Sequence, residues 1–333
     1  MSRPTIALAM MDGLLSHAFE PEHLERLDQV GELLDPLPMS RFDDDRATAL
    51  LGQTEVLVGH WGCPTLTDEV MEKAQGLRLF AYAAGTVKWQ VTDAVWHRGV
   101  TVTSAAVANA VPVAEYAAGA ILLAGKGVFL FAAKERQPDA RVPLDPFRVG
   151  NFRCRVGLVG ASFVGRKVVE LLRPTDLDLA VADPYLSEED AAALGVRRME
   201  LDQLCGWCDI LSLHAPDIPS TRHMFGAVQL AALHDGVTII NTARGALIDH
   251  EAMRSELREG RLAAVLDVTD PEPLPADDEL RTLPNVLVTP HVAGAVNGEL
   301  WRLADLAVVE VERFAAGLPP LYPVHEADLE RLA

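Results

Sequence analysis

Three polar residues, Arg244, Glu272 and His291, each follow a short apolar run in the last third of the chain. An arginine can hold an anionic substrate and polarise its carbonyl group. A histidine is the usual proton donor near neutral pH, and a carboxylate hydrogen-bonded to it fixes its orientation and favours its protonated form. These residue types together suit the reduction of a ketone, in which hydride transfer is coupled to proton transfer.

Each of these residues also has a structural alternative. Arg244 could pair with a nearby carboxylate, and Glu272 could be solvated in its proline-rich acidic loop. His291 could be a buried residue that caps a strand. Their joint placement favours one shared site, because the carboxyl ends of parallel strands face the ligand crevice of a doubly wound sheet.

A turn between an apolar strand and a helix indicates a dinucleotide site. Residues 155–166 read RVGLVGASFVGR, so the motif is Gly160-x-Ser162-x-x-Gly165, with serine at the middle position. The first glycine makes the tight turn, the third lets helix and strand pack closely, and the helix N-terminus faces the phosphates. Ser162 either hydrogen-bonds a phosphate oxygen or weakens binding. The structural alternative is a plain tight turn.

An acidic residue ends the next expected strand. Asp183 lies 18 positions beyond Gly165, near the spacing of about 20 that dinucleotide sites show. A carboxylate there binds both ribose hydroxyls of NAD and repels the 2′-phosphate of NADP. Asp183 could instead cap a helix or a turn before Pro184. The order of strand, turn, helix, strand and aspartate predicts NAD as the cofactor.

These residues require parallel sheets to position them, and apolar runs alternate with helix-forming segments along most of the chain. The first series of expected strands covers residues 5–10, 55–59, 77–83 and 100–104. The second covers residues 155–160, 178–183, 209–215, 237–241, 262–268 and 285–289. Continuous apolar strands between helices indicate parallel sheets that are covered on both faces.

Two further helices set the domain organisation. A long apolar helix over residues 111–134 separates the two series of strands. A last helix over residues 298–316 has no strand to feed and could pack back on the first series. The first domain would then be built from both ends of the chain.

Composition bounds the remaining choices. A chain of 333 residues suggests roughly two domains. Its net charge of −19, without a run of Lys or Arg, argues against nucleic acid or an anionic membrane as a partner. Four cysteines, and no signal-peptide pattern in residues 1–13, point to the cytoplasm. Residues 110–133 are interrupted by Pro112, Glu115 and Lys126, which favours a buried helix at a domain or subunit interface over a membrane span.

At these motifs the chain resembles the D-isomer-specific 2-hydroxyacid dehydrogenase family. The segments that carry the resemblance are NTARGALID at 241–249, DVTDPEPL at 267–274 and TPHVAG at 289–294, supported by LHAP at 213–216 and PVAE at 112–115. The resemblance covers most of the chain. Several motifs in the correct order are more specific than the glycine loop alone.

The resemblance implies an α/β fold with two doubly wound parallel-sheet domains. A Rossmann-type NAD-binding domain, residues 109–296, would be inserted in a flavodoxin-like substrate domain made of residues 1–108 and 297–333. It implies a homodimer and an NAD-dependent enzyme that interconverts a small 2-oxo acid and a D-2-hydroxy acid. Arg244 would bind and polarise the substrate, and His291 with Glu272 would act as the acid/base pair.

The resemblance also implies a set of binding residues. The cofactor would contact the glycine loop, Asp183, and Asp267 at the nicotinamide carboxamide. It would further be lined by Phe163, Val164, Ala215, Pro216, Thr221, Thr242 and Ala243. The substrate would contact Arg244 and the loop that contains Gly85 and Thr86. Trp61 would line the pocket or serve as a packing aromatic, and the same choice applies to Trp301.

The chain departs from the family pattern in the loop that usually reads GxGxD, which here is Ala84-Gly85-Thr86-Val87-Lys88. This departure bears on the substrate class more than on the reaction type. Glu272 argues against formate as the substrate, because the members that act on formate have Gln at that position. No metal site is expected.

Two other interpretations stay open. Cys205-Gly-Trp-Cys208 matches a redox CxxC spacing, although two semi-buried structural cysteines are the favoured alternative because no redox fold surrounds them. The whole chain could also be an NAD(H)-sensing regulatory protein with little turnover, since fold does not determine function. The presence of Arg244, Glu272 and His291 favours catalysis.

Overall fold

The computed structural model describes residues 3–147 and 149–329. The chain forms two compact units. One contains the chain up to Asn109 and again from Ala295, and the other contains Ala110–Gly294. A hydrogen bond of 3.0 Å from the Ala295 backbone N–H to Oδ1 of Asn109 joins the two chain segments where they leave the first unit.

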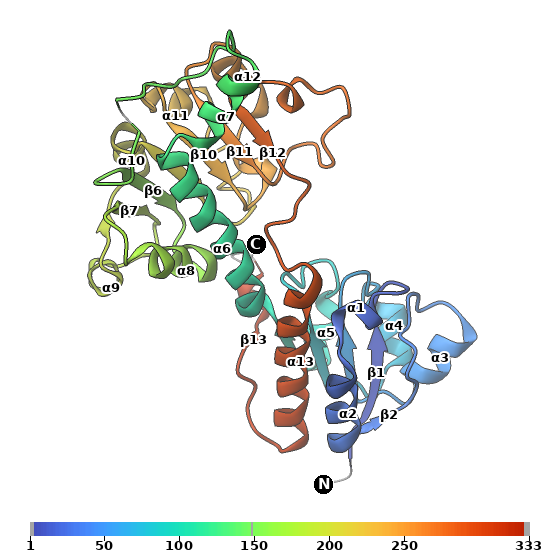
Figure 1. Cartoon of the computed structure of the whole chain (residues 1–333). Helices are drawn as coiled ribbons and strands as arrows, with labels where there is room; N and C mark the ends of the chain where they lie inside the picture. The colour runs from blue at the N-terminus through green and yellow to red at the C-terminus, as the bar shows by residue number, and fades with distance from the viewer. Residues whose placement is uncertain (1–2, 148, 330–333) are drawn as a thin grey trace. The chain divides into compact units, whose positions relative to one another are not determined.

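The first unit is built on a six-stranded sheet (Figure 1). Its strands are β1 (Thr5–Ala9), β2 (Glu32–Leu33), β3 (Val56–Gly59), β4 (Leu79–Tyr82), β5 (Thr101–Ser104) and β13 (Pro323–Val324). Their order is β13-β5-β4-β3-β1-β2, and only β13 runs antiparallel to its neighbour. The parallel part has the flavodoxin-like order that we predicted.

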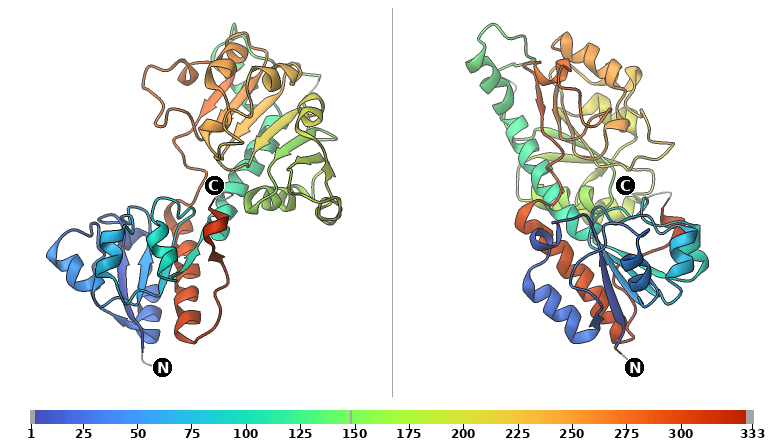
Figure 2. Two further views of the ribbon diagram at one scale, coloured as in Figure 1. Left: turned by 180° about the vertical axis from the view of Figure 1, so that it is seen from behind. Right: turned by 90° about the vertical axis from the view of Figure 1, so that its right-hand side faces the viewer.

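Helices cover both faces of this sheet. They are α1 (Leu15–Ala18), α2 (Pro21–Val30), α3 (Asp45–Leu51), α4 (Asp68–Lys73), α5 (Asp93–His97) and α13 (Leu300–Ala315), with 3₁₀ turns at Asn297–Glu299 and Glu326–Asp328. Ile6 and Leu8 face the core formed with α1, α2 and α13, whereas Ala7 and Ala9 face the core formed with α3, α4 and α5. The expected last helix therefore packs on the first series of strands, as Figure 2 shows from two sides.

The second unit is built on a seven-stranded parallel sheet. Its strands are β6 (Arg155–Val159), β7 (Asp178–Ala182), β8 (Arg197–Arg198), β9 (Ile210–Leu213), β10 (Thr238–Asn241), β11 (Ala263–Leu266) and β12 (Val286–Val288). The order is β12-β11-β10-β9-β6-β7-β8. The order reverses beside β6, which is the arrangement of a Rossmann-type sheet and its ligand crevice.

The helices of the second unit also lie on both faces. They are α6 (Ala106–Gly125), which begins in the first unit, α7 (Val128–Arg136), α8 (Phe163–Leu172), α9 (Glu188–Leu194), α10 (Leu201–Trp207), α11 (Ala227–Ala232) and α12 (His250–Arg258), with 3₁₀ turns at Gly245–Leu247 and Glu279–Arg281. Helices α6, α8 and α9 share one core, and α10, α11 and α12 share the other. The expected α/β fold class is thus confirmed.

The single helix predicted over residues 111–134 is wrong in one respect, because the structure has two helices there. Gly127 separates α6 from α7 with φ +65°, a left-handed conformation that ends a right-handed helix. A helical pattern of apolar residues continues across Gly127, so periodicity alone could not reveal the break.

Helix α6 was also expected to be too interrupted to span a membrane, yet it has the length and composition of a span. Half of its most apolar 18-residue window is buried inside the structure, as in the core helices of many water-soluble folds.

Candidate active site

Three neighbouring strands bring Arg244, Glu272 and His291 to the same edge of the second sheet. Asn241 of β10 pairs with Leu266 of β11, which in turn pairs with Val288 of β12. The loop after each of these strands carries one of the three residues. The parallel register of β10, β11 and β12 therefore brings the three loops together, as the sequence motifs predicted.

Glu272 and His291 are in direct contact, with 2.5 Å between Nδ1 of His291 and Oε1 of Glu272. Both side chains are substantially exposed, at 51% for His291 and 40% for Glu272. His291 is therefore not a buried strand cap, and Glu272 is not a freely solvated loop residue. The Glu272 carboxylate accepts a hydrogen bond from the Nδ1–H group of His291, which leaves Nε2 available to a ligand.

Arg244 lies beside this pair and makes no ion pair among the described residues. Its Nη1 atom donates to the carbonyl oxygen of Ala243 at 2.6 Å. Burial lowers the pKa of Arg244. The carboxylates of Glu272 and Asp217 favour the charged guanidinium and partly offset this effect. A half-buried guanidinium with most of its donors unused can bind an anion in a bidentate manner.

The loops that carry Arg244 and Glu272 meet backbone to backbone. A Cβ atom on Gly245 would lie 2.1 Å from the carbonyl carbon of Thr269, so no larger residue fits. The buried side chain of Asn241 shapes the same turn, because its Nδ2 donates to Arg244 O and its Oδ1 accepts from Ala243 N. Neither residue type indicates such a role by itself, although both residues lie in the NTARGALID segment.

Asp267 is buried, with 2% exposure, and its carboxylate supports the loop that carries His291. Oδ1 accepts from the hydroxyl of Thr289 at 2.6 Å and from Val292 N at 2.8 Å, and Oδ2 accepts from Ala293 N at 2.9 Å. Three of the roughly four acceptor positions of a carboxylate are therefore occupied. One position remains for the expected contact with a carboxamide.

The glycine loop makes a tight turn in which two positions have no room for a side chain. Gly160 has φ +101°, and a Cβ atom there would lie 2.7 Å from the carbonyl oxygen of His214. A Cβ atom on Gly165 would lie 2.1 Å from the carbonyl oxygen of Gly160. Both glycines are therefore required by the turn and by the close packing of α8 against β6.

Ser162 occupies a position where the backbone does not demand glycine. It is the N-cap residue of α8 with φ −80°, and its side chain makes no capping hydrogen bond. The residue is exposed at the helix N-terminus. Serine is thus sterically acceptable, and its hydroxyl is available to an anion at the positive end of the helix.

Asp183 is joined to the glycine loop. Its Oδ2 accepts from Ala161 N at 2.7 Å, and its Oδ1 accepts from Tyr185 N at 2.7 Å. The residue therefore organises the turn after β7, and the remaining lone pairs of both oxygens can still accept from ribose hydroxyls. The two interpretations of Asp183 are compatible.

The other expected cofactor residues lie around the same strand ends. Thr221 closes its loop by donating to Pro216 O at 2.5 Å, and buried Ala215 follows β9. The Thr242 hydroxyl is buried without a hydrogen-bond partner among the described residues. Phe163 and Val164 open α8, and Ala243 precedes Arg244. The orphaned hydroxyl, the glycine cradle and the carboxylate of Asp183 fit a dinucleotide.

In the first unit, Gly85 and Thr86 lie in the loop that follows β4. The carbonyl oxygen of Gly85 accepts from the hydroxyl of Ser104 at 2.6 Å. The N–H groups of Gly85 and Thr86 have no acceptor among the described residues. The loop therefore has two backbone N–H donors that are not used within the described residues.

The two tryptophans of interest both belong to the first unit. Trp61 is 37% exposed, and its ring packs edge-on against that of His60, with 5.0 Å between the ring centroids. Trp301 is 42% exposed and donates from Nε1 to His17 O. Trp61 thus has a ring partner and Trp301 a hydrogen-bond partner, and both rings are partly exposed.

The CxxC pair is not suited to redox chemistry. Cys205 and Cys208 are both fully buried and free. Burial raises the pKa of Cys205 to about 11 and that of Cys208 to about 12, so thiolate is scarce at neutral pH. The favoured alternative of structural cysteines is consistent with this burial.

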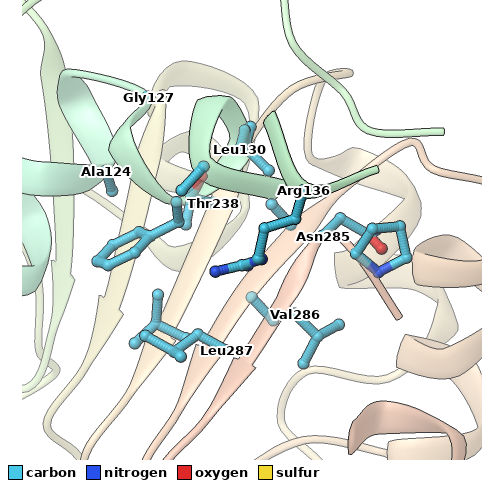
Figure 3. Close-up of a pocket in the computed structure, with 14 residues that line it drawn as sticks. Ala124, Gly127, Leu130, Arg136, Thr238, Asn285, Val286 and Leu287 are labelled. Carbon is cyan, nitrogen blue, oxygen red and sulfur yellow. The ribbon is translucent and has the colours of Figure 1, made fainter. Parts of the chain in front are cut away.

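A pocket of about 110 Å³ lies away from these residues. Figure 3 shows it between α7 and the starts of β10, β11 and β12, with the side chain of Arg136 lying across it. Thr238, Asn285 and Leu287 contribute to its wall. Because the pocket is at the amino ends of the strands, it is separate from the edge that carries His291.

Comparisons with known proteins agree with this geometry. Residues 126–293 match the family model described as D-isomer specific 2-hydroxyacid dehydrogenase, NAD binding domain. A D-3-phosphoglycerate dehydrogenase of Methanocaldococcus jannaschii is 30% identical over 90% of this chain and 56% of its own length. A glyoxylate reductase of Korarchaeum cryptofilum is 31% identical over 77% of this chain and 80% of its own length.

A solved structure has a similar fold. The TT0316 protein of Thermus thermophilus superimposes with a TM-score of 0.74 and 27% identity over 96% of this chain and all of that one. This chain spans about half the length of the phosphoglycerate dehydrogenases that it matches. The family model and the relatives together show that the chain belongs to the D-isomer specific 2-hydroxyacid dehydrogenase family.

Proposed function

We propose that the protein is an NAD-dependent oxidoreductase that interconverts a small 2-oxo acid and a D-2-hydroxy acid. The observation that carries this proposal is the contact between His291 and Glu272 beside the unpaired guanidinium of Arg244. A sensing protein would need the dinucleotide site but would have no use for this group of three.

Each residue has a distinct role in the proposed reduction. Arg244 binds the carboxylate and polarises the carbonyl of the 2-oxo acid through its unused donors. His291 gives a proton from Nε2 to the carbonyl oxygen, and Glu272 stabilises the imidazolium through Nδ1. In oxidation the same imidazole takes the proton back.

The cofactor would be held by the second unit, which we propose as the NAD-binding domain. Gly160, Ser162 and the N-terminus of α8 would hold the pyrophosphate, and Asp183 the adenosine ribose. Bound NADH would supply the hydride for C2 of the substrate. The first unit would be the substrate domain, and the N–H groups of Gly85 and Thr86 would be its proposed substrate-binding groups. Residues 1–2 and 330–333 of the expected substrate domain lie outside the described residues.

The test is a turnover assay with NADH and a panel of 2-oxo acids from glyoxylate to phenylpyruvate, followed by loss of absorbance. We expect turnover on at least one acid, and a loss of about 10²–10⁴-fold in His291→Ala with the thermal midpoint unchanged. Arg244→Ala should lose turnover on a similar scale. Binding of NADH without turnover on any acid would instead support the sensing function.

We also propose that the protein is a homodimer that covers the pocket of Figure 3. Its surroundings expose Val128, Phe131 and Leu287, each at about 40%. Phe147 and Phe152 are exposed at 96% and 73%. The rim carries Arg136, which a carboxylate of a second copy could pair with. Sequence similarity to a family of dimeric enzymes favours the same partner.

Sedimentation velocity tests the dimer. Phe131→Asp should produce monomers at micromolar concentration, whereas Val228→Asp, which changes a residue of α11 that is 76% exposed, should leave dimers. A monomeric wild-type protein would contradict the proposal. All four cysteines are free, which is compatible with the cytoplasmic location that we propose.

A further inference from the structure

The loop that carries His291 holds an unfavourable backbone conformation. His291 has φ +55°, in the left-handed region that residues other than glycine rarely adopt. Such a conformation persists only where the surroundings enforce it. Two hydrogen bonds of 3.0 Å do so directly, from His291 N to the carbonyl oxygens of Asp267 and Thr289.

The buried carboxylate of Asp267 adds the rest of the restraint. It binds Thr289 on one side of His291 and Val292 and Ala293 on the other. Among the described residues no cation pairs with this carboxylate, so the three donors are its stabilising partners. Thr289 is the one of these donors that lies on the N-terminal side of His291, so its loss would leave that side without a bond to the carboxylate.

A residue from outside the loop completes this network. Tyr116 of α6 places its hydroxyl 2.7 Å from Oγ1 of Thr289. A threonine hydroxyl has one proton, and Thr289 uses it to donate a hydrogen bond to Asp267. Tyr116 must therefore be the donor, and the chain of hydrogen bonds runs from Tyr116 through Thr289 to Asp267.

Helix α6 packs directly against the sheet in the region of this contact. Ala114, Ala117 and Ala118 pack against the sheet in the core that contains Val156 and Val265. Small side chains bring the helix axis close to the sheet, and the larger Tyr116 then reaches the loop after β12. Burial raises the pKa of Tyr116, so its hydroxyl stays protonated and remains a donor.

We propose that Tyr116 is a positioning residue for His291, acting through the hydroxyl of Thr289 and the carboxylate of Asp267. This inference rests on the proposed role of His291 as the proton donor. Tyr116 itself touches neither the imidazole nor Glu272. It fixes the direction in which Nε2 presents its proton by restraining the loop on the N-terminal side of His291.

The experiment compares Tyr116→Phe with Tyr322→Phe, which removes a hydroxyl from an exposed tyrosine near the C-terminal end of the described chain. We expect Tyr116→Phe to lower kcat about threefold to tenfold, the worth of one hydrogen bond. The Kd of NADH, measured by fluorescence, and the thermal midpoint should stay at wild-type values. The solvent deuterium isotope effect on kcat should rise, because proton transfer becomes more limiting. Tyr322→Phe should change none of these quantities.

A second pair of variants tests the path. Thr289→Val breaks it and should lower kcat by about tenfold to a hundredfold, whereas Thr289→Ser keeps the hydroxyl and should remain within about twofold of wild type. Tyr116→Phe should have no further effect in the Thr289→Val background, because the two residues act in series.

The outcomes separate this inference from the proposed function. If His291→Ala is inactive while Tyr116→Phe and Thr289→Val turn over normally, the inference is overturned and the proposed function stands. If Tyr116→Phe lowers kcat, NADH affinity and the thermal midpoint together, Tyr116 has a purely structural role. That result would also overturn the inference. Full activity of His291→Ala would overturn both proposals.

Discussion

Nδ1 of His291 lies 2.5 Å from Oε1 of Glu272, although 19 positions separate the two residues in the chain. One follows β12 and the other follows β11, and the pairing of Leu266 with Val288 places the two loops side by side. The contact therefore depends on strand register, and it leaves the opposite ring nitrogen of His291 free for a substrate.

The first prediction concerns the charge of Glu272. Glu272→Gln keeps a hydrogen-bonding oxygen but removes the negative charge that stabilises the imidazolium. We expect kcat to fall by about tenfold to a hundredfold, less than the loss for His291→Ala, because the proton donor itself remains. Steady-state kinetics in both directions measure this, and turnover equal to wild type would remove Glu272 from the acid/base pair.

The second prediction concerns the serine in the glycine loop. Its backbone has φ −80°, and its hydroxyl makes no capping bond. If the hydroxyl donates to the pyrophosphate, Ser162→Ala and Ser162→Gly should both weaken NADH binding by about tenfold or more, as for a hydrogen bond to a charged group. Fluorescence titration gives the two Kd values. Tighter binding by Ser162→Gly would mean that the Cβ atom obstructs the cofactor.

The third prediction concerns cofactor choice. Asp183 is the carboxylate expected to bind the ribose, and it also holds Ala161 N of the glycine loop. Asp183→Asn keeps an acceptor for that N–H but removes the charge that repels a 2′-phosphate. We expect the preference for NADH over NADPH in kcat/KM to shrink. An NADPH preference in the wild-type protein would contradict the assignment.

The fourth prediction concerns acid stability. His60 is buried, its Nδ1 accepts from Trp61 N, and burial lowers its pKa to about 4. In the unfolded chain its pKa is about 6.5, so the unfolded state binds more protons between pH 6.5 and 4. The stability that the neutral ring contributes is complete above pH 6.5 and is lost progressively towards pH 4, by up to about 3 kcal/mol.

Scanning calorimetry at pH 7 and pH 5 tests this dependence. In His60→Asn the transition of the first unit should shift less between the two pH values than it does in the wild type. His214 has a pKa of about 4 for the same reason and gives the second unit its own dependence, which should be unchanged. An identical shift in both proteins would show that a group other than His60 causes the loss of stability of the first unit at low pH.

Much of the fold could be predicted because apolar runs mark buried strands. The runs around Val156 and Ile239 are continuous, as parallel strands covered on both faces require. The edge strands Glu32–Leu33, Arg197–Arg198 and Pro323–Val324 were not expected. Each has two residues and no apolar run, so its pairing depends on a neighbouring strand and not on its own composition.

The sequence could predict which strand ends carry the site residues, but it could not predict the side-chain contacts between them. Arg244, Glu272 and His291 follow recognisable strands, and parallel strands end at one edge. The hydrogen bond from Tyr116 to Thr289 spans 173 positions and depends on how closely α6 packs on the sheet. No local pattern encodes that distance, although both residues lie in or beside motifs of the family.

The hydrogen bond between Asn109 and Ala295 has a consequence for how the chain can be rearranged. It places the two ends of the inserted unit next to each other, so the inserted unit begins and ends at nearly the same point. A short flexible linker between these residues should replace the insert and leave a small protein with the sheet of β1 to β5 and helix α13. By the same geometry, the inserted unit could be moved as one piece into a surface loop of another scaffold.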